Sequence, residues 1–471
     1  MRRAKIVCTL GPASDSPEVI AQLIHAGMNV ARLNFSHGSH DYHRALYKRV
    51  RDVAEELNKP VAIMQDLQGP KIRVGKFKDG PVQLIEGNEF VITIDDIEGD
   101  QERVSTTYKE LTRDIAVGDV LLLDDGLIRL EAIDVTATDV RTIVQIGGLL
   151  KNNKGINLPT AAVSAPSMTE KDKIDLKLGL ELGVDYIALS FVRSALDIHQ
   201  LHALIPPQTH DIKIISKIEK PQAIHELEDI ISVSDGIMIA RGDLGVELPP
   251  QKVPLIQKRA IRMANEMGRI SITATQMLES MTENARPTRA EASDVANAVL
   301  DGTDAVMLSG ETAAGKYPVE SVRMMASIVE EVEHGRGSPI HHGPQFIQHL
   351  RTFPNAVAKA ASIAADELNV SAIVVFTESG ATARLMMTYR PTKPIVACTP
   401  NERVYNQLAM YWGVEAYQID LLQNTQGILS RVEKMMVEKR GAKSGDEIII
   451  VMGNPAGAGS ETNLIKFHRI P

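Results

Sequence analysis

The sequence predicts an α/β protein built on a (β/α)8 barrel of the TIM type, with an inserted all-β domain and a C-terminal α/β domain. Two observations predict the barrel. Eight short apolar stretches alternate with segments of helical spacing, and polar residues recur just after these stretches. Parallel barrels build their functional sites at the carboxyl ends of their strands. A doubly wound sheet remains compatible with the alternation alone.

The length and composition of the chain limit its class. With 471 residues, the chain exceeds what one core usually supports, so two or three domains are expected. A net charge of −9 and 4% aromatic residues disfavour a nucleic acid partner, so a phosphorylated substrate would need a local basic cluster. The two cysteines fit a reducing compartment. No apolar run approaches the roughly 18 residues of a membrane span, so we expect a cytoplasmic protein without a membrane partner.

The barrel is expected in residues 1–69 and 167–335. Its strands are predicted at 5–10, 28–33, 60–66, 184–191, 212–219, 236–240, 270–275 and 305–308. One segment gives conflicting signals, because alternating apolar residues at 174–182 favour a strand. The capping pattern of Thr169 and Asp172 favours a helix, which the βα alternation also needs there.

An inserted domain is expected at residues 70–166, between Gly69-Pro70 and Ala165-Pro166. Short alternating stretches separated by Gly-Asn, Gly-Asp and Asp-Gly turns indicate an all-β fold. Because the insertion follows the third barrel strand, it could close over the site as a lid. A domain that never touches substrate is the alternative.

A stretch rich in Gly, Pro and His at 334–344 is typical of a linker. Beyond it, residues 345–471 are expected to form the α/β domain, with a helix at 355–368. Strands are predicted at 372–376, 394–398, 414–419 and 447–452. The hydroxyl-rich turn 377–382 precedes a helix and could hold a phosphate, but an ordinary helix cap needs the same residues.

The strongest chemical signal lies in the strand 212–219, which ends in Lys217 and Glu219. Residues i and i+2 of a strand share a face, so these two side chains project together. The next strand is followed by Asp243, a second carboxylate at the same relative point. Two oxygen ligands and an ammonium suit Mg²⁺ and a phosphate. For either strand alone, an exposed salt bridge is the ordinary alternative.

Phosphoryl transfer depends mostly on positioning and charge neutralisation. Arg32 offers a planar fork for phosphate oxygens, and Lys217 offers a compact charge for the transferring group or an enolate. The amides of Gly242 and Asp243 could bind a substrate carboxylate, since glycine permits close approach. No Ser-His-Asp or Cys-His pattern indicates a covalent mechanism.

Seven short motifs, several of them containing the residues above, follow one another along the chain. They are RLNFSHG at 32–38, DLQGPKIR at 66–73, KNNKGINLP at 151–159, IISKIE at 214–219, ARGDLG at 240–245, TATQML at 273–278 and MLSGET at 307–312. The chain therefore resembles a bacterial pyruvate kinase over almost its full length. The resemblance implies Mg²⁺-dependent transfer from phosphoenolpyruvate to ADP, giving pyruvate and ATP in the last step of glycolysis. It also implies a homotetramer, and Mn²⁺ could replace Mg²⁺.

The resemblance also implies roles for individual residues. Catalytic roles fall on Lys217, Arg32, Thr275 and Ser309. Phosphoenolpyruvate binding falls on Arg32, Gly242, Asp243 and Thr275. The Mg²⁺ ligands would be Glu219 and Asp243. Nucleotide binding falls on Arg73, Lys154, Asn34 and His37, with Lys154 brought in by the lid.

One departure concerns potassium. By the resemblance, family members that need K⁺ surround the ion with the residues at the positions of Asn34, Ser36 and Asp66 and with a Thr. Those members have a Glu at the position of Lys71. Here the Thr position is Leu67. A lysine ammonium could take over the electrostatic role of the ion, so K⁺ is not expected to be required. The alternative is that Lys71 merely faces solvent.

The third domain resembles the family's effector domain. Its phosphate loop would comprise Thr377, Glu378, Ser379, Gly380 and Thr382, facing a glycine-rich loop at 453–463. The negative charge of Glu378 argues against a sugar bisphosphate and leaves a sugar monophosphate or a nucleotide as effector.

Two other functions stay open. A metal-dependent enolate aldolase or lyase on the same barrel would share the carboxylates but would not need Arg73, Lys154 and the lid. A non-catalytic regulatory paralogue that binds phosphometabolites would be expected to have lost some of the catalytic set. The residues in question, all present, are Lys217, Glu219, Asp243 and Thr275.

Overall fold

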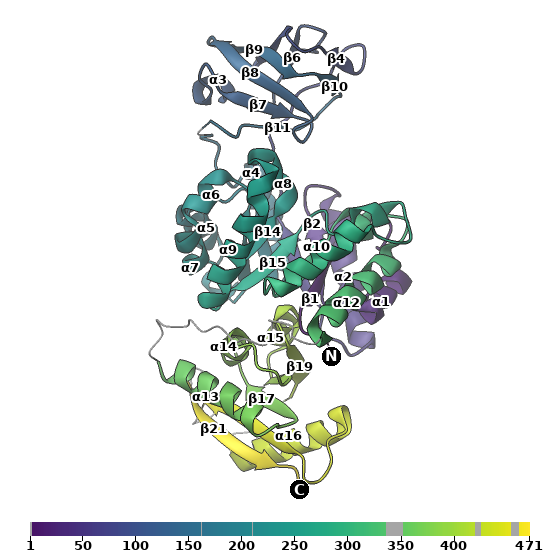
Figure 1. Cartoon of the computed structure of the whole chain (residues 1–471), viewed down its shortest axis with the longest axis vertical. Helices are drawn as coiled ribbons and strands as arrows, with labels where there is room; N and C mark the ends of the chain where they lie inside the picture. Colours follow the sequence, from purple (N-terminus) through teal and green to yellow (C-terminus); the bar gives the residue numbers. More distant parts are fainter. Residues whose placement is uncertain (1, 162, 210, 336–351, 420–424, 454–460) are drawn as a thin grey trace.

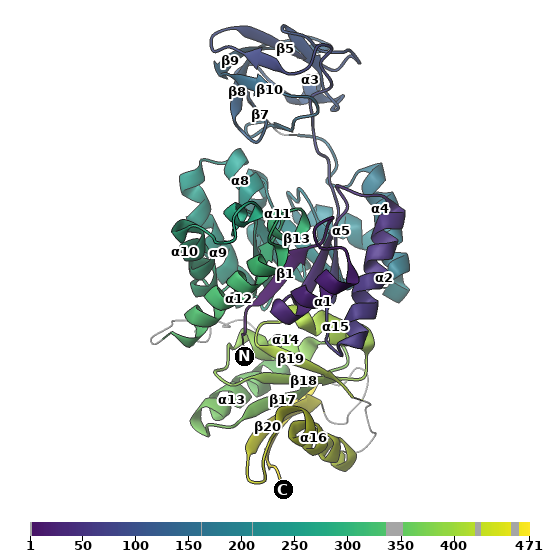
Figure 2. The same cartoon turned by 90° about the vertical axis from the view of Figure 1, so that its right-hand side faces the viewer.

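The computed structural model describes residues 2–161, 163–209, 211–335, 352–419, 425–453 and 461–471. Three bodies follow one another along the long axis of the molecule, with the barrel in the middle (Figures 1 and 2). The all-β insertion lies beyond one end of the barrel and the C-terminal domain lies against the other. In the described part of the chain, no helix is both long enough and apolar enough to span a bilayer.

Eight parallel strands close into a barrel in the order β1-β16-β15-β14-β13-β12-β3-β2, which excludes the doubly wound sheet. Their bounds are β1 (Lys5–Thr9), β2 (Val30–Asn34), β3 (Ala62–Asp66), β12 (Tyr186–Leu189), β13 (Lys213–Ile218), β14 (Gly236–Ala240), β15 (Ile270–Ala274) and β16 (Ala305–Leu308). Almost all of these residues are buried, because helices cover the outside and side chains fill the inside.

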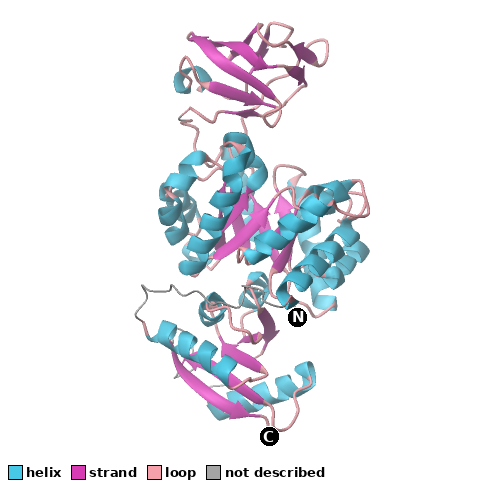
Figure 3. Ribbon diagram, viewed as in Figure 1, coloured by secondary structure: helices cyan, strands magenta, loops and turns pink. Residues whose placement is uncertain are grey.

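The covering helices surround the barrel in Figure 3. They are α1 (Pro17–Ala26), α2 (His40–Glu56), α4 (Glu170–Leu182), α5 (Ala195–Leu204), α6 (Pro221–His225), α7 (Leu227–Val233), α8 (Arg241–Glu247), α9 (Val253–Glu266), α10 (Arg289–Leu300), α11 (Gly310–Ala313) and α12 (Pro318–His334). The helical interpretation of 174–182 is confirmed, since Thr169 and Asp172 form a reciprocal capping box at the start of α4. Two short helices, α8 and α11, were not predicted and begin within the motifs at 240–245 and 307–312.

The insertion is all-β apart from α3 (Leu111–Asp114), with its own hydrophobic core. Its strands are β4 (Val82–Leu84), β5 (Glu89–Thr93), β6 (Arg103–Ser105), β7 (Val120–Leu123), β8 (Ile128–Val135), β9 (Asp139–Ile146), β10 (Gly148–Leu150) and β11 (Ile156–Asn157). At its entry, Gly69 has φ +70°, and a Cβ there would lie 2.6 Å from the Phe191 ring. This joint therefore requires glycine.

The C-terminal domain holds a five-stranded sheet in the order β19-β18-β17-β20-β21. Its elements are α13 (Phe353–Glu367), β17 (Ala372–Phe376), α14 (Ala381–Thr388), β18 (Ile395–Thr399), α15 (Glu402–Gln407), β19 (Val414–Gln418), α16 (Thr425–Arg440), β20 (Glu447–Gly453) and β21 (Thr462–Arg469). The antiparallel edge strand β21 was not predicted. The expected linker lies largely outside the described residues, as do residues 454–460 of the expected effector loop.

The barrel and the C-terminal domain meet through buried polar groups. The Arg390 guanidinium pairs with Asp304 at 2.7 Å and lies 4.5 Å from the centroid of the Trp412 ring. At the start of β1, the buried Lys5 ammonium donates a hydrogen bond of 2.7 Å to the carbonyl of Val414. Burial lowers the pKa of Lys5 to about 7, with the neighbouring charge of Arg2 acting in the same direction.

This buried lysine predicts a pH-dependent stability. Between about pH 7 and the ordinary lysine pKa of about 10.4, the unfolded chain binds a proton at Lys5 that the folded chain does not. Stability should therefore rise with pH across this window. In Lys5→Met that contribution disappears, so the thermal midpoint of the variant relative to wild type should fall as the pH increases from 7 to 10. A constant difference in midpoint would contradict the lowered pKa.

Candidate active site

Lys217 lies at the carboxyl end of β13 and is surrounded by oxygen atoms. Its Nζ is 2.9 Å from Glu219 Oε1, 3.3 Å from Asp66 Oδ1 and 2.8 Å from Ser190 Oγ. The predicted pairing of Lys217 with Glu219 is therefore confirmed. The contacts of Asp66 and Ser190 with the ammonium come from two other strands and were not predicted.

Arg32 extends this cluster from β2. Its Nε and Nη2 both lie 2.6 Å from Asp66 Oδ2, and its Nη1 donates to Thr9 Oγ1 at 2.8 Å. Arg32 and Asp66 are both buried, and Asp66 contacts both cations. One carboxylate thus holds a guanidinium and an ammonium at the same point, an arrangement suited to a phosphoryl group.

Burial and neighbouring charges together determine the pKa values of Lys217 and Asp66. Burial opposes the charge of Lys217, but Asp66 and Glu219 outweigh it and raise the pKa of Lys217 above its ordinary value. Burial also opposes ionisation of Asp66, yet Arg32 and Lys217 together lower the pKa of Asp66. Lys217 is therefore a cation and Asp66 an anion throughout the neutral range.

The negative charges of the Glu219 and Asp243 carboxylates repel each other. Glu219 Oε2 accepts a hydrogen bond of 2.8 Å from the Phe191 amide. Burial raises the pKa of Glu219, and although Lys217 opposes this, the charge of Asp243 adds to it. A divalent cation between the two carboxylates would relieve this repulsion, so this donor set fits Mg²⁺ or Mn²⁺. Within the described ranges, no group of three or more His, Cys, Asp and Glu side chains is placed to bind a metal.

Thr275 connects the ends of β14 and β15. It has φ +69°, and its Oγ1 accepts a hydrogen bond of 2.7 Å from the Gly242 amide while donating to the Ala274 carbonyl. Arg241 donates to the Thr275 carbonyl at 3.0 Å. Thr275 and Gly242 are thus brought together as expected. In this structure, however, the Gly242 amide is bonded to the threonine hydroxyl.

Ser309 follows β16 and is held by Glu311. The Ser309 amide donates to Glu311 Oε2 at 2.7 Å, while Glu311 Oε1 accepts from the Leu278 amide at 3.0 Å. The Ser309 hydroxyl is buried and has no hydrogen-bond partner among the residues described. Glu311 thus ties together the loops after β15 and β16.

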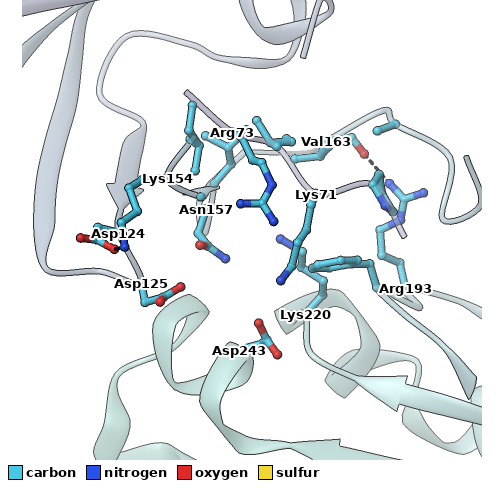
Figure 4. A pocket seen from close by; sticks show the side chains of 17 residues that line it. Lys71, Arg73, Asp124, Asp125, Lys154, Asn157, Val163, Arg193, Lys220 and Asp243 are labelled. Carbon is cyan, nitrogen blue, oxygen red and sulfur yellow. Dashed lines mark hydrogen bonds and ion pairs between the residues drawn. The ribbon is translucent and has the colours of Figure 1, made fainter. Parts of the chain in front are cut away.

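A cavity of about 210 Å³ lies between the lid and the barrel. Both predicted lid cations, Arg73 and Lys154, line it together with Asp243 (Figure 4). Lys154 pairs with Asp124 at 2.6 Å, and Arg73 donates to the Asn153 carbonyl at 2.8 Å. Sequence reasoning missed several other lining residues: Asp124, Asp125, Asn157, Arg193 and Lys220. The signals present were the motif at 151–159, which contains Asn157, and the Asp-Asp-Gly turn at 124–126, whose two aspartates have positive φ.

The residues of the expected monovalent-cation region are partly brought together. Asn34 Oδ1 accepts from the Ser36 amide at 3.1 Å, and Leu67 is buried. Lys71 is exposed and projects into the cavity on the side of Asp243 (Figure 4). In the described part of the chain, it forms no ion pair with Asp66.

His37 lies on the surface near the basic residues of the cavity. Burial lowers the pKa of His37, and the charges of Lys71, Arg73 and Arg32 lower it further. These three cations thus lie close enough to His37 to act on its charge.

The expected phosphate loop lies between β17 and α14. Gly380 has φ +82° at the N-cap of α14, and the hydroxyl groups of Thr382 and Thr462 lie 2.8 Å apart. Thr377 is buried, Glu378 is half-buried and Ser379 is exposed. The glycine-rich loop that would face them is largely outside the described residues.

The fold agrees with comparisons to known proteins. Residues 1–322 match the family model "Pyruvate kinase, barrel domain", and residues 355–468 match "Pyruvate kinase, alpha/beta domain". A pyruvate kinase from Mycobacterium intracellulare is 49% identical over 471 residues, covering 100% of this chain and 98% of that protein. One from Staphylococcus aureus is 46% identical, covering 100% and 81%.

A solved structure agrees as well. The crystal structure of a pyruvate kinase from Cryptosporidium parvum superposes with a TM-score of 0.94 and 37% identity, covering 100% of this chain and 96% of that one. The two family models together match most of the chain, and the relatives align with it over its full length. The chain belongs to the pyruvate kinase family.

Proposed function

We propose that the Lys217 cluster is the phosphoryl-transfer centre of a pyruvate kinase that uses Mg²⁺. The family's reaction transfers the phosphoryl group of phosphoenolpyruvate to ADP and yields pyruvate and ATP. The observation that carries the assignment is the Lys217 ammonium, buried within 3.3 Å of carboxylates from two different strands. A permanent cation at the carboxyl end of the barrel is suited to a phosphoryl group in transit.

Each member of the cluster receives a role from its contacts. Arg32 binds phosphoryl oxygens with the edge of its guanidinium that Asp66 leaves open. Lys217 stabilises the phosphoryl group and the enolate left behind. Glu219 and Asp243 would hold Mg²⁺, or Mn²⁺, which when bound neutralises charge on phosphoryl and enolate oxygens.

The enolate must then accept a proton to become pyruvate. Thr275 and Gly242 lie beside Asp243, where substrate would bind, and the Thr275 hydroxyl is part of the proton route. The unpartnered Ser309 hydroxyl is available to hold a water molecule on that route.

The cations of the lid favour a kinase over a lyase or aldolase. Arg73 and Lys154 line the cavity that also contains Asp243, so a nucleotide held by the lid would face the metal carboxylates. Asn34 and His37 would contact the same nucleotide. A coupled pyruvate assay tests this directly, because pyruvate formation without ADP would favour the lyase.

The remaining properties are also proposals. By the resemblance to its family, the protein works in the cytoplasm as a homotetramer in the last step of glycolysis. A sugar monophosphate or a nucleotide would bind at residues 377–382. The exposed Ser379 and the positive φ of Gly380 leave backbone and hydroxyl donors at that turn.

Replacement of Lys217 by Met should lower kcat by at least about 10²-fold, the scale of one electrostatic contact made in the transition state. The matched control is Lys213→Met, because Lys213 begins the same strand and pairs with Asp235 at 3.6 Å. Steady-state assays should show near wild-type kcat for this control. If Lys217→Met kept wild-type turnover, Lys217 would have no part in the mechanism.

Lys71 is proposed to supply the monovalent charge that other members take from K⁺. Wild-type activity should then be the same in potassium and tetramethylammonium salts, whereas Lys71→Glu should require K⁺. Lys78→Glu makes the same change at an exposed lysine of the lid and should not create the requirement. An absolute K⁺ requirement in the wild type would refute the role of Lys71.

A further inference from the structure

At the cavity, the lid is connected to the barrel by a hydrogen bond from Arg193 to the Val163 carbonyl and by one between two side chains. The side chain of Asn157, at the end of β11, donates from Nδ2 to Oε1 of Glu247 at the end of α8, at 2.8 Å. Among the described residues, it is the one hydrogen bond between side chains that links 70–166 with the barrel. This pair of side chains therefore links the lid to the barrel beside the hydrogen bond from Arg193 to the Val163 carbonyl.

Loss of the hydrogen bond from Asn157 would be unfavourable for Glu247, because the Glu247 carboxylate is buried. Its side chain is 1% exposed, and Oε1 also pairs with Lys220 Nζ at 2.5 Å. Its Oε2 is buried and has no hydrogen-bond partner within the described ranges. Since a buried carboxylate requires compensation, Lys220 and Asn157 together hold this charge in place.

On the barrel side, Lys220 and Glu247 lie close in sequence to the proposed metal ligands Glu219 and Asp243. Lys220 directly follows Glu219, and Glu247 lies one turn after Asp243 on α8. Lys220 also lies 5.5 Å from the centroid of the Phe191 ring, and the Phe191 amide binds Glu219. Both proposed metal carboxylates are therefore connected to this contact through their own segments.

On the lid side, the contact lies next to the proposed nucleotide cations. Asn157 is three residues after Lys154, and the intervening Gly155 forms a bridge with Arg73. Figure 4 shows Asn157, Arg73 and Lys154 on the lid side of the cavity and Lys220 and Asp243 on the barrel side. The hydrogen bond thus joins the two halves of the site where they face each other.

We propose that Asn157, Glu247 and Lys220 are positioning residues that set the distance between nucleotide phosphates on the lid and the phosphoryl group on the barrel. The proposal rests on the roles assigned above to Arg73 and Lys154. In-line transfer depends on this distance, and a displacement of about 1 Å can lower a rate by about 10²-fold. The three residues act through the cations and carboxylates beside them.

The test is steady-state kinetics of Asn157→Ala with ADP and phosphoenolpyruvate varied separately. Loss of a hydrogen bond to a charged group should raise the KM for ADP by about tenfold and lower kcat. The KM for phosphoenolpyruvate should change by less than about twofold, since the barrel side remains intact. The matched control is Gln145→Ala, whose amide bonds Glu131 within the lid at 2.9 Å and should leave both KM values unchanged.

A double-mutant cycle with Glu247→Gln separates positioning from a general loss of structure. If the contact acts as a unit, the double variant should have the KM for ADP of the more affected single variant. Asn157→Gln, which keeps the donor amide, should recover part of the loss. Additive effects in the cycle, or equal increases in both KM values, would overturn the proposal.

Lys154→Ala distinguishes this proposal from the nucleotide assignment on which it rests. A raised KM for ADP in Lys154→Ala with wild-type values in Asn157→Ala would refute the positioning role alone. Wild-type kinetics in Lys154→Ala would refute the nucleotide assignment, and the positioning role with it.

Discussion

The active site depends on one compensated charge, the Lys217 ammonium buried among oxygen atoms. Burial lowers the pKa of this ammonium, and Asp66 and Glu219 reverse that effect. Asp66 is in turn kept ionised by Arg32 and Lys217. Each of these buried charges is therefore kept ionised by an opposite charge beside it. With Asp243 added, the carboxylates outnumber the cations, so the charge of the site favours a divalent ion.

The barrel topology brings this cluster together. β3, β12 and β13 are neighbours in the closed sheet, and Asp66, Ser190 and Lys217 lie at or just after their carboxyl ends. The Ser190 hydroxyl, directly after the middle strand, donates to the Leu67 carbonyl at 2.6 Å and contacts the Lys217 ammonium. Because parallel strands end at the same edge, residues far apart in the sequence meet within hydrogen-bond distance.

Local sequence patterns predicted part of this site. The pair Lys217 and Glu219 follows from the two-residue period of a strand, and α4 followed from its capping box. Asp66 was expected only as a monovalent-cation ligand, because its contact with Lys217 spans three strands and leaves no local signal. The same holds for Asn157 and Glu247, 90 residues apart. The edge strand β21 was not predicted, and only its first two residues fall within the segment interpreted as an effector loop.

The central claim is that Glu219 and Asp243 share a divalent cation beside the Lys217 ammonium. Titration with Mn²⁺, followed by the electron paramagnetic resonance signal of the free ion, tests it without any assay of turnover. Glu219→Gln and Asp243→Asn should each weaken Mn²⁺ binding by at least about tenfold, whereas Asp229→Asn, on α7, should not. Wild-type Mn²⁺ binding in both carboxylate variants would contradict the account.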